Sequence, residues 1–218
     1  MEKKTLETRY YSADYETRAE GDEGIIIGRP IVYSSWTDLG WFDEIIEPNA
    51  LDGADMSDVR LCLNHDTSYV YARSRRGNLN NTMSLNPNAE GLDIEARLNL
   101  AGSPKAQDYF SAVSRGDMSG MSFMFSVASD QWDDIDSDHP KRHILKIASV
   151  VEVSAVTFPA YDATAISARS KEALENARRA LENARSLNAE KPVETGIDEL
   201  ALEKAKTKII LQRSIFTR

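Results

Sequence analysis

A short apolar segment just past the middle of the chain has the sequence Met118-Ser119-Gly120-Met121-Ser122-Phe123-Met124-Phe125. From Met121 onward, large apolar side chains at every second position alternate with Ser122 and Met124. This period of two predicts a β-strand with the aromatic rings on one face and Ser122 on the other. Because a glycine stands just before this strand, Ser122 is a candidate for a presented nucleophile, although serine is also an ordinary residue of strands and turns.

Several other short segments show strand patterns, and few show helical ones. Residues 25–33, 41–46, 59–66 and 143–158 are rich in β-branched and aromatic residues, and residues 79–85 and 91–98 predict a strand pair across an Asn-Pro-Asn turn. Residues 104–115 predict a helix with proline in its first turn. Many short strands at close spacing favour a mainly β body with a few helices, an α+β class in which the strands form a barrel or a curled sheet.

Composition excludes several classes of protein. No run of about 18 uncharged apolar residues is present, so we expect no membrane span, and the charged N-terminus does not resemble a signal peptide. The single cysteine, Cys62, excludes an internal disulfide and fits a reducing compartment. A formal charge of −9 argues against nucleic-acid binding, which usually needs a basic surface.

The charge is distributed unevenly along the chain, which predicts separate units. Residues 1–163 carry 15 Lys and Arg against 27 Asp and Glu, whereas residues 164–218 carry 11 against 8. Within this tail, residues 173–179 nearly repeat as residues 180–186, a heptad step that predicts an amphipathic helix. Lys191-Pro192 predicts its end, and a second helix is expected from about residue 195 to 214. At the other end, residues 1–23 are rich in charge and are expected to form a flexible arm or at most an edge strand.

Three polar residues of the β-rich body have the chemistry of acyl transfer. His65 stands at a predicted strand end, Ser122 begins a strand, and Glu152 interrupts the β-branched run Val150-Val151-Glu152-Val153. A hydroxyl needs a base such as imidazole to become a nucleophile, and a carboxylate can hold that imidazole in the required tautomer. The alternative for Glu152 is a position on a solvated strand face that it shares with Ser154, and the alternative for His65 is a surface or core histidine.

Two other constellations are weaker. Cys62 and His65 are three positions apart on a predicted strand, so their side chains point to opposite faces and do not suit a thiol nucleophile with its base. His139 and His143 follow an aspartate-rich loop at residues 130–138, but the spacing matches no calcium-binding loop and favours a solvated hairpin tip. We therefore expect no metal and no cofactor.

A resemblance to a known family rests on five short motifs in order. They are Gly28 to Tyr33 with Leu39 to Leu51, then Leu63-Asn64-His65-Asp66, Gly91-Leu92, Gly116 to Phe123, and Val151 to Tyr161. In this order they resemble the tailed-phage prohead maturation proteases, whose fold is similar to that of the herpesvirus assemblins. The resemblance covers about residues 24–168. It departs at Met124, where the family often has a glycine after the first aromatic residue.

The resemblance implies a serine endopeptidase on an assemblin-like curled β-barrel. His65 matches the family's histidine base and Ser122 its nucleophile. Glu152 lies in the family's Glu-Val-Ser segment and suits the orienting role, with His143 as the alternative third member, because assemblins use a second histidine there. The implied division is a flexible arm (1–23), the protease domain (24–168) and a helical tail (169–218).

The resemblance also implies where the enzyme works and on what. It predicts a protease in the host cytoplasm, enclosed in the immature capsid, that cuts scaffold, the scaffolding segment of the major capsid protein, and itself. A homodimer or higher oligomer is a further expectation, with no nucleic-acid or membrane partner. The body and tail alone would equally suit a non-catalytic scaffold or assembly factor, which should tolerate Ser122→Ala without loss.

Overall fold

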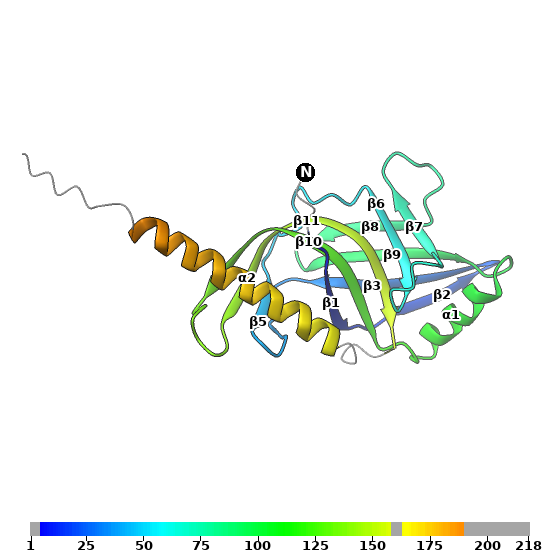
Figure 1. Ribbon diagram of the computed structural model, residues 1–218. Helices are drawn as coiled ribbons and strands as arrows, with labels where there is room; N and C mark the ends of the chain where they lie inside the picture. Colours follow the sequence, from blue (N-terminus) through cyan, green and yellow to red (C-terminus); the bar gives the residue numbers. More distant parts are fainter. Residues whose placement is uncertain (1–4, 158–162, 190–218) are drawn as a thin grey trace, which may run out of the picture. The chain divides into compact units, whose positions relative to one another are not determined.

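The computed structural model describes residues 5–157 and 163–189, with side chains for residues 5–157 and 170–186. The described chain contains eleven strands and two helices (Figure 1). In order they are β1 (Glu7–Ser12), β2 (Glu16–Glu20), β3 (Glu23–Val32), β4 (Thr37–Asp38), β5 (Asp43–Ile46), β6 (Asp58–Leu63), β7 (Ala72–Arg75), β8 (Met83–Asn88), β9 (Gly91–Asn99), α1 (Pro104–Ser114), β10 (Gly120–Asp133), β11 (Lys141–Val156) and α2 (Ala163–Ala189). The described part of the chain is therefore mainly β, with two helices of which the second follows the last strand.

The strands form two sheets, and one long hairpin carries the larger of them. In the seven-stranded sheet the order β1-β10-β11-β5-β4 is extended by β6, which pairs with β11, and by β7. The other sheet has the order β2-β3-β9-β8. Among the described residues, the strand pairings do not join the two sheets into a closed barrel, so the barrel predicted from the resemblance stays a prediction.

The hairpin of β10 and β11 connects distant parts of the larger sheet. The register between the two strands shifts four times between Met124 and Asp130, and such bulges bend and twist a strand pair. Because of its length, β11 pairs in parallel with β5 near its start and with β6 near its end. The end of β11 thereby has β6 on one side and β10 on the other, although these two strands are far apart in sequence.

The predicted alternation in residues 121–125 is confirmed, but both faces of this strand are buried. Phe123 and Phe125 are fully buried in the main apolar core, which also contains Tyr109 from α1. Ser122, on the opposite face, is 0% exposed as well. The polar face is therefore covered by other parts of the chain instead of facing solvent.

The N-terminal residues form edge strands, which is the alternative to a flexible arm that the sequence analysis left open. Strands β1 and β2 both lie within residues 1–23, and β1 pairs antiparallel with β10 from Glu7 opposite Phe125 to Ser12 opposite Gly120. The charge-rich composition does not predict these strands, because Arg9 is buried and Glu7 half-buried in ion pairs. A count of charged residues does not distinguish such pairs from solvated charges.

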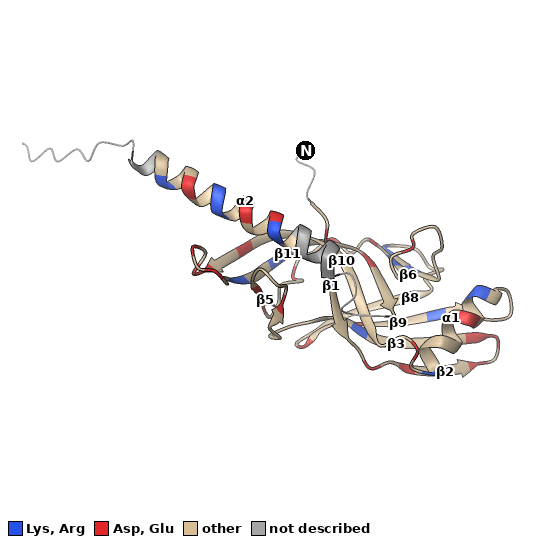
Figure 2. Cartoon of the chain, turned by 60° about the horizontal axis from the view of Figure 1, so that its bottom comes forward, with Lys and Arg blue, Asp and Glu red and all other residues tan. Residues whose placement is uncertain are grey.

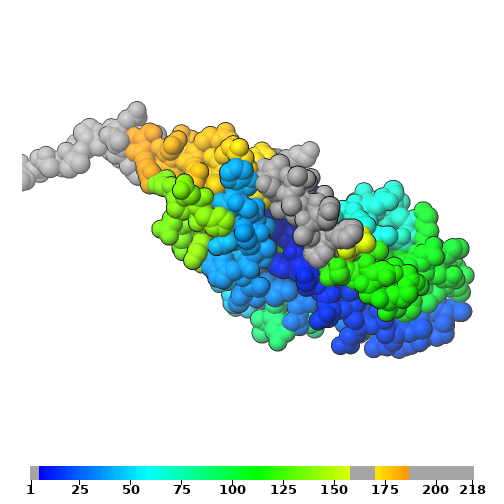
Figure 3. Space-filling view, turned by 90° about the horizontal axis from the view of Figure 1, so that it is seen from below, coloured from blue at the N-terminus to red at the C-terminus, as the bar shows by residue number. Residues whose placement is uncertain are grey.

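The predicted tail helix begins earlier than the heptads and packs partly on the body. Leu174 of α2 is buried against Leu39 and Phe42, and Arg178 donates to the carbonyl oxygens of Ile135 (2.8 Å) and Ser137 (2.7 Å). Figure 3 shows the yellow part of α2 beside the blue segment that carries β4 and β5. Residues 1–178 and 179–218 form two compact units. The second predicted helix, residues 195–214, lies outside the described residues, and neither described helix is long and apolar enough to cross a membrane.

Candidate active site

Ser122 lies at the start of β10, directly opposite Ser154 of β11 and Tyr10 of β1. Its hydroxyl oxygen is 2.6 Å from Nε2 of His65. This distance is that of a hydrogen bond between a hydroxyl and an imidazole nitrogen. The structure thus brings together two of the three residues that the sequence selects as candidates.

His65 follows β6 in a backbone conformation that few residues adopt. Asn64 and His65 have φ angles of 48° and 61°, both in the left-handed region, where asparagine is among the better tolerated residues. Two bonds to the end of β11 hold this turn: Asn64 N–H donates to the carbonyl oxygen of Ala155 (3.0 Å), and Thr157 N–H donates to Asn64 Oδ1 (3.1 Å). The turn directs the imidazole back toward the β10–β11 pair.

Glu152 is buried (2% exposed) and binds the other side of the same imidazole. Its Oε2 lies 2.5 Å from His65 Nδ1. A carboxylate accepts only, so Nδ1 carries a proton in this arrangement and Nε2 is then free to accept one from Ser122. The solvated strand face considered for Glu152 is wrong, because the chain buries this carboxylate and provides it with partners.

Ser154 is a fourth member of this group that sequence analysis does not select. Its hydroxyl donates to Oε1 of Glu152 and accepts a hydrogen bond from the backbone N–H of His65 (3.1 Å). Ser154 is 0% exposed. The available signal is its position two residues after Glu152, which places both side chains on one face of β11.

Cys62 does not have the properties of a reactive thiol. It is buried opposite Ser154, and burial together with the nearby charge of Glu152 raises the pKa of its thiol to about 12. At neutral pH such a group is protonated, whereas a nucleophilic cysteine needs its thiolate. This agrees with the sequence analysis, in which the spacing of Cys62 and His65 does not suit a thiol nucleophile with its base.

His143, the alternative third member, has a different set of partners. Its Nδ1 lies 2.7 Å from Glu47 Oε1, its Nε2 lies 3.2 Å from Asp133 Oδ2, and its ring packs edge-on against Trp36. His143 pairs with Ile45 near the start of β11, whereas Glu152 lies nearer its end. The described contacts of His143 therefore do not include Ser122 or His65.

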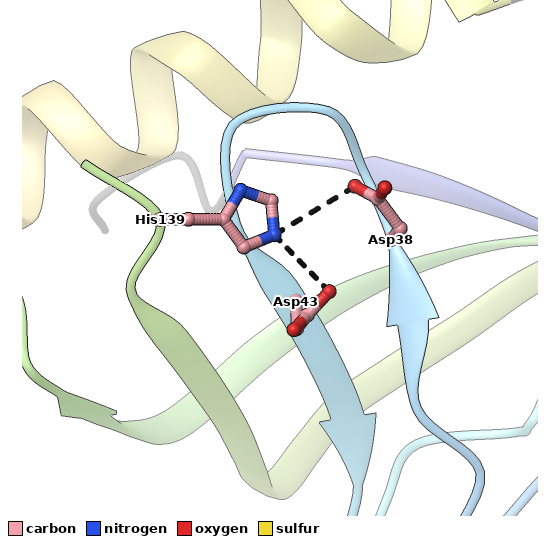
Figure 4. A group of neighbouring side chains, drawn as sticks. All are labelled: Asp38, Asp43 and His139. Carbon is pink, nitrogen blue, oxygen red and sulfur yellow. Dashed lines mark hydrogen bonds and ion pairs between the residues drawn. The ribbon is translucent and has the colours of Figure 1, made fainter. Parts of the chain in front are cut away.

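The aspartate-rich loop forms the tip of the β10–β11 hairpin, where Figure 2 shows acidic positions gathered. Beside it, His139 Nε2 lies 3.1 Å from Asp43 Oδ1 and 3.8 Å from Asp38 Oδ1 (Figure 4). One ligand atom from each residue lies within 4.8 Å of the others. All three side chains are substantially exposed, which describes a surface ion-pair cluster, and nothing further in the described structure points to a bound metal.

Strand β1 covers the serine. The Ser122 hydroxyl donates to the backbone carbonyl oxygen of Arg9 (2.8 Å), and the Tyr10 ring packs edge-on against His65 with 5.5 Å between centroids. One hydroxyl proton cannot be donated to Arg9 and to His65 at the same time. Donation to Arg9 withdraws the proton from the base, so this arrangement does not by itself activate the serine.

Comparison with known proteins matches the chain to a family model. The model describes the Caudovirus prohead serine protease and matches residues 13–179. No curated protein and no solved structure matched the chain. Since the matched range contains β2 to β11 with His65, Ser122 and Glu152, and covers well over half of the sequence, the chain belongs to the Caudovirus prohead serine protease family.

Proposed function

We propose that His65, Ser122 and Glu152 are the catalytic triad of this serine protease. The observation that carries this proposal is the pair of contacts on one imidazole, 2.6 Å from Nε2 to Ser122 Oγ and 2.5 Å from Nδ1 to Glu152 Oε2. This order of groups, with the base between the nucleophile and an orienting carboxylate, is the one that acyl transfer requires.

Each step follows from this geometry once the Ser122 hydroxyl donates to His65 instead of to the carbonyl oxygen of Arg9. His65 accepts the proton of Ser122 through Nε2 as Oγ attacks the scissile carbonyl carbon and forms a tetrahedral intermediate. Glu152 stabilises the imidazolium and keeps Nδ1 protonated. The imidazolium then donates its Nε2 proton to the leaving amine as the C–N bond breaks. A water, deprotonated by His65, attacks the acyl-enzyme, and the ester bond breaks as His65 returns this proton to Ser122 Oγ.

The family supports a role in capsid maturation, and we propose the particular substrates. These are scaffold, the scaffolding segment of the major capsid protein, and the enzyme itself, cut within the immature capsid. We further propose a homo-oligomer, an assemblin-like barrel for the protease domain, and a tail that docks on scaffold or capsid subunits. The basic excess of residues 164–218 supports docking on an acidic partner.

Intact mass tests the triad and its substrates together. Purified wild type and Ser122→Ala are incubated alone and with the cognate capsid protein and scaffold. Shorter species of the enzyme or of either substrate are expected with the wild type only, and their masses give the cut sites. Equal cutting by the wild type and by Ser122→Ala would show that Ser122 is not the nucleophile. If the wild type cut itself but left capsid protein and scaffold intact, the proposed substrates would be wrong.

A further inference from the structure

Strand β1 occupies the place on the sheet that an extended peptide substrate needs. It is the edge strand next to β10, the strand that carries Ser122, and its residues pair antiparallel with β10 over the whole of β1 (Figure 1). Peptides commonly bind by adding a strand to such an edge. The family match starts at residue 13, so β1 lies outside the part of the chain that the family model describes.

Arg9 has a special place within β1. Its carbonyl oxygen accepts the hydrogen bond from Ser122 Oγ, so its peptide group lies directly at the nucleophile. In a substrate, the residue whose carbonyl lies at the nucleophile is the one on the amino side of the scissile bond. The side chain of Arg9 thus marks where the side chain of that substrate residue goes.

The Arg9 side chain enters a buried acidic socket. It is 3% exposed, and its Nε and Nη2 lie 2.5 and 2.7 Å from the two carboxylate oxygens of Glu44, which is 2% exposed. The guanidinium also lies over the ring of Phe125, 5.5 Å from its centroid. A carboxylate that accepts a bidentate pair of hydrogen bonds and the face of an aromatic ring are both features that recognise a cation.

The charges that remain when β1 leaves also favour a cation. Glu7 and Arg9 leave together, and Glu44 and Asp130 then share one arginine, Arg142, at 3.0 and 2.7 Å. Two carboxylates with one guanidinium leave a formal negative charge at the site. A neutral side chain in place of Arg9 would leave the buried Glu44 carboxylate with fewer donors, which is unfavourable.

We propose that Glu44 recognises a basic side chain, arginine or lysine, on the amino side of the scissile bond, and that Arg9 fills this subsite in the described structure. This inference rests on the proposed role of Ser122. It assigns the substrate class as peptides with a basic residue before the cut, bound as an added strand on the edge of β10. Substrate and β1 then compete for one position.

A peptide library tests the preference across all cleavage sequences at once. The full-length wild type is incubated with a complex peptide mixture, and mass spectrometry identifies the residue before each cut. After correction for the abundance of each residue in the mixture, arginine and lysine are expected before the cut at least ten times as often as methionine, leucine or glutamate. If the residues before the cuts were not enriched in arginine and lysine, the proposal would be overturned. This experiment uses the wild type alone.

Two variants separate recognition from blocking. Arg9→Ala is expected to raise the rate of cleavage of basic peptides about tenfold or more, since the internal competitor is weakened while Glu44 is retained. Glu44→Gln is expected to reduce the ratio of basic to methionine sites about tenfold. Arg18→Ala, at a half-exposed arginine of neighbouring β2, is the matched control and should change neither quantity.

Labelling with a fluorophosphonate distinguishes this inference from the proposed triad. Labelling of Ser122 with cleavage that ignores basic residues would overturn the subsite and leave the triad intact. If circular dichroism showed that Glu44→Gln is unfolded, the residue preference of the wild type in the peptide library would decide the test. If neither wild type nor Arg9→Ala were labelled or cut any peptide, the triad and the subsite would both be wrong.

Discussion

The hydroxyl of Ser154 connects two members of the proposed triad, because it accepts the N–H of His65 at 3.1 Å while it donates to the carboxylate of Glu152. The first contact fixes the left-handed backbone of His65, and the second fixes the rotamer of Glu152. In the proposed mechanism Ser154 is thus a positioning residue, which acts on the reaction only through His65 and Glu152.

Replacing Ser154 with alanine is expected to lower kcat by roughly ten- to a hundredfold with little change in KM. The expected loss follows from one hydrogen bond to a charged group and one to the backbone of the base, each worth about 1–3 kcal/mol. Steady-state cleavage of a peptide containing a mapped cut site gives both constants. A proportionate rise in KM with unchanged kcat would contradict a positioning role.

Ser126→Ala is the matched control for this change. Ser126 is also a buried serine of the β10–β11 hairpin, and its hydroxyl bonds Ser149 at 2.8 Å, away from the triad. Ser126→Ala should destabilise the fold about as much as Ser154→Ala, on the order of 1 kcal/mol, and leave kcat within about twofold of the wild-type value. A comparable fall in kcat would mean that the effect at Ser154 reflects general loosening of the hairpin.

Glu152→Gln is expected to lower kcat by about a hundred- to ten-thousandfold. The amide preserves the shape, but it can present an N–H to Nδ1 and favour the tautomer in which Nε2 cannot accept the serine proton. The rate of fluorophosphonate labelling at Ser122 should fall in parallel, since it depends on the same proton transfer. Glu47→Gln, at the carboxylate that binds His143, is the control and should leave both rates within about twofold. Equal losses in the two variants would make His143 a candidate for the third member again.

Local alternation is sufficient to predict the strands that carry Ser122 and Glu152, because side chains in a strand obey a period of two wherever the strand lies. It is also sufficient to place His65 at the end of β6. It cannot show that the three meet, since this depends on the parallel pairing of β6 with β11, between residues about 90 positions apart. The family resemblance supplies that step.

Buried charges account for most of what the sequence does not predict. Glu7, Arg9, Glu44 and Arg142 are all charged residues that a composition count treats as solvated, yet each is largely buried in one ion-pair network. Apart from Glu7 and Arg9, which are two positions apart, the paired residues of this network are separated by 35 to 135 positions, so no local pattern reveals the network. For the same reason the sequence predicts an arm or at most an edge strand where β1 lies, and it does not predict that this strand covers Ser122.

Glu7 gives the network a pH dependence with a definite sign. Burial opposes ionisation of Glu7, but the attraction of Arg9 and Arg142 outweighs it and lowers its pKa from 4.5 to about 2. A depressed folded-state pKa adds stability that is fully present above the unfolded-state pKa and is lost as the pH falls through the folded-state value. The contribution of Glu7 is therefore expected to be constant above about pH 4.5–5 and to decline between pH 4.5 and 2.

The free energy of unfolding of wild type minus that of Glu7→Gln isolates this contribution. Urea titrations from pH 7 to 3 should give a positive difference that narrows below about pH 4.5. Glu20→Gln, at an exposed glutamate of β2, should give a small difference throughout. A Glu7 difference that stays flat to pH 3 would contradict the depressed pKa.

Gly91→Ala is expected to destabilise the protein by about 3 kcal/mol or more. Gly91 has a φ of 148°, which side chains rarely adopt, and a Cβ there would lie 1.9 Å from the carbonyl oxygen of Ile31. Gly53→Ala is the control, since Gly53 also has a positive φ of 79° but no atom within 4 Å of the added carbon. Its cost should be about 1 kcal/mol, from backbone strain alone. Equal losses in thermal or urea unfolding would mean that the contact with Ile31 relaxes freely.

The proposed docking role of the tail is best tested with a cut after Arg178. A deletion from residue 170 would also remove Leu174 and Arg178, which pack on Leu39, Phe42 and the hairpin tip, so lost packaging and lost folding would be confused. The shorter deletion, residues 179–218, removes one compact unit. It is expected to retain kcat on a peptide within about twofold and to abolish encapsidation, measured as the amount of protease in purified proheads. Normal packaging of this active, truncated enzyme would assign docking to the protease domain itself.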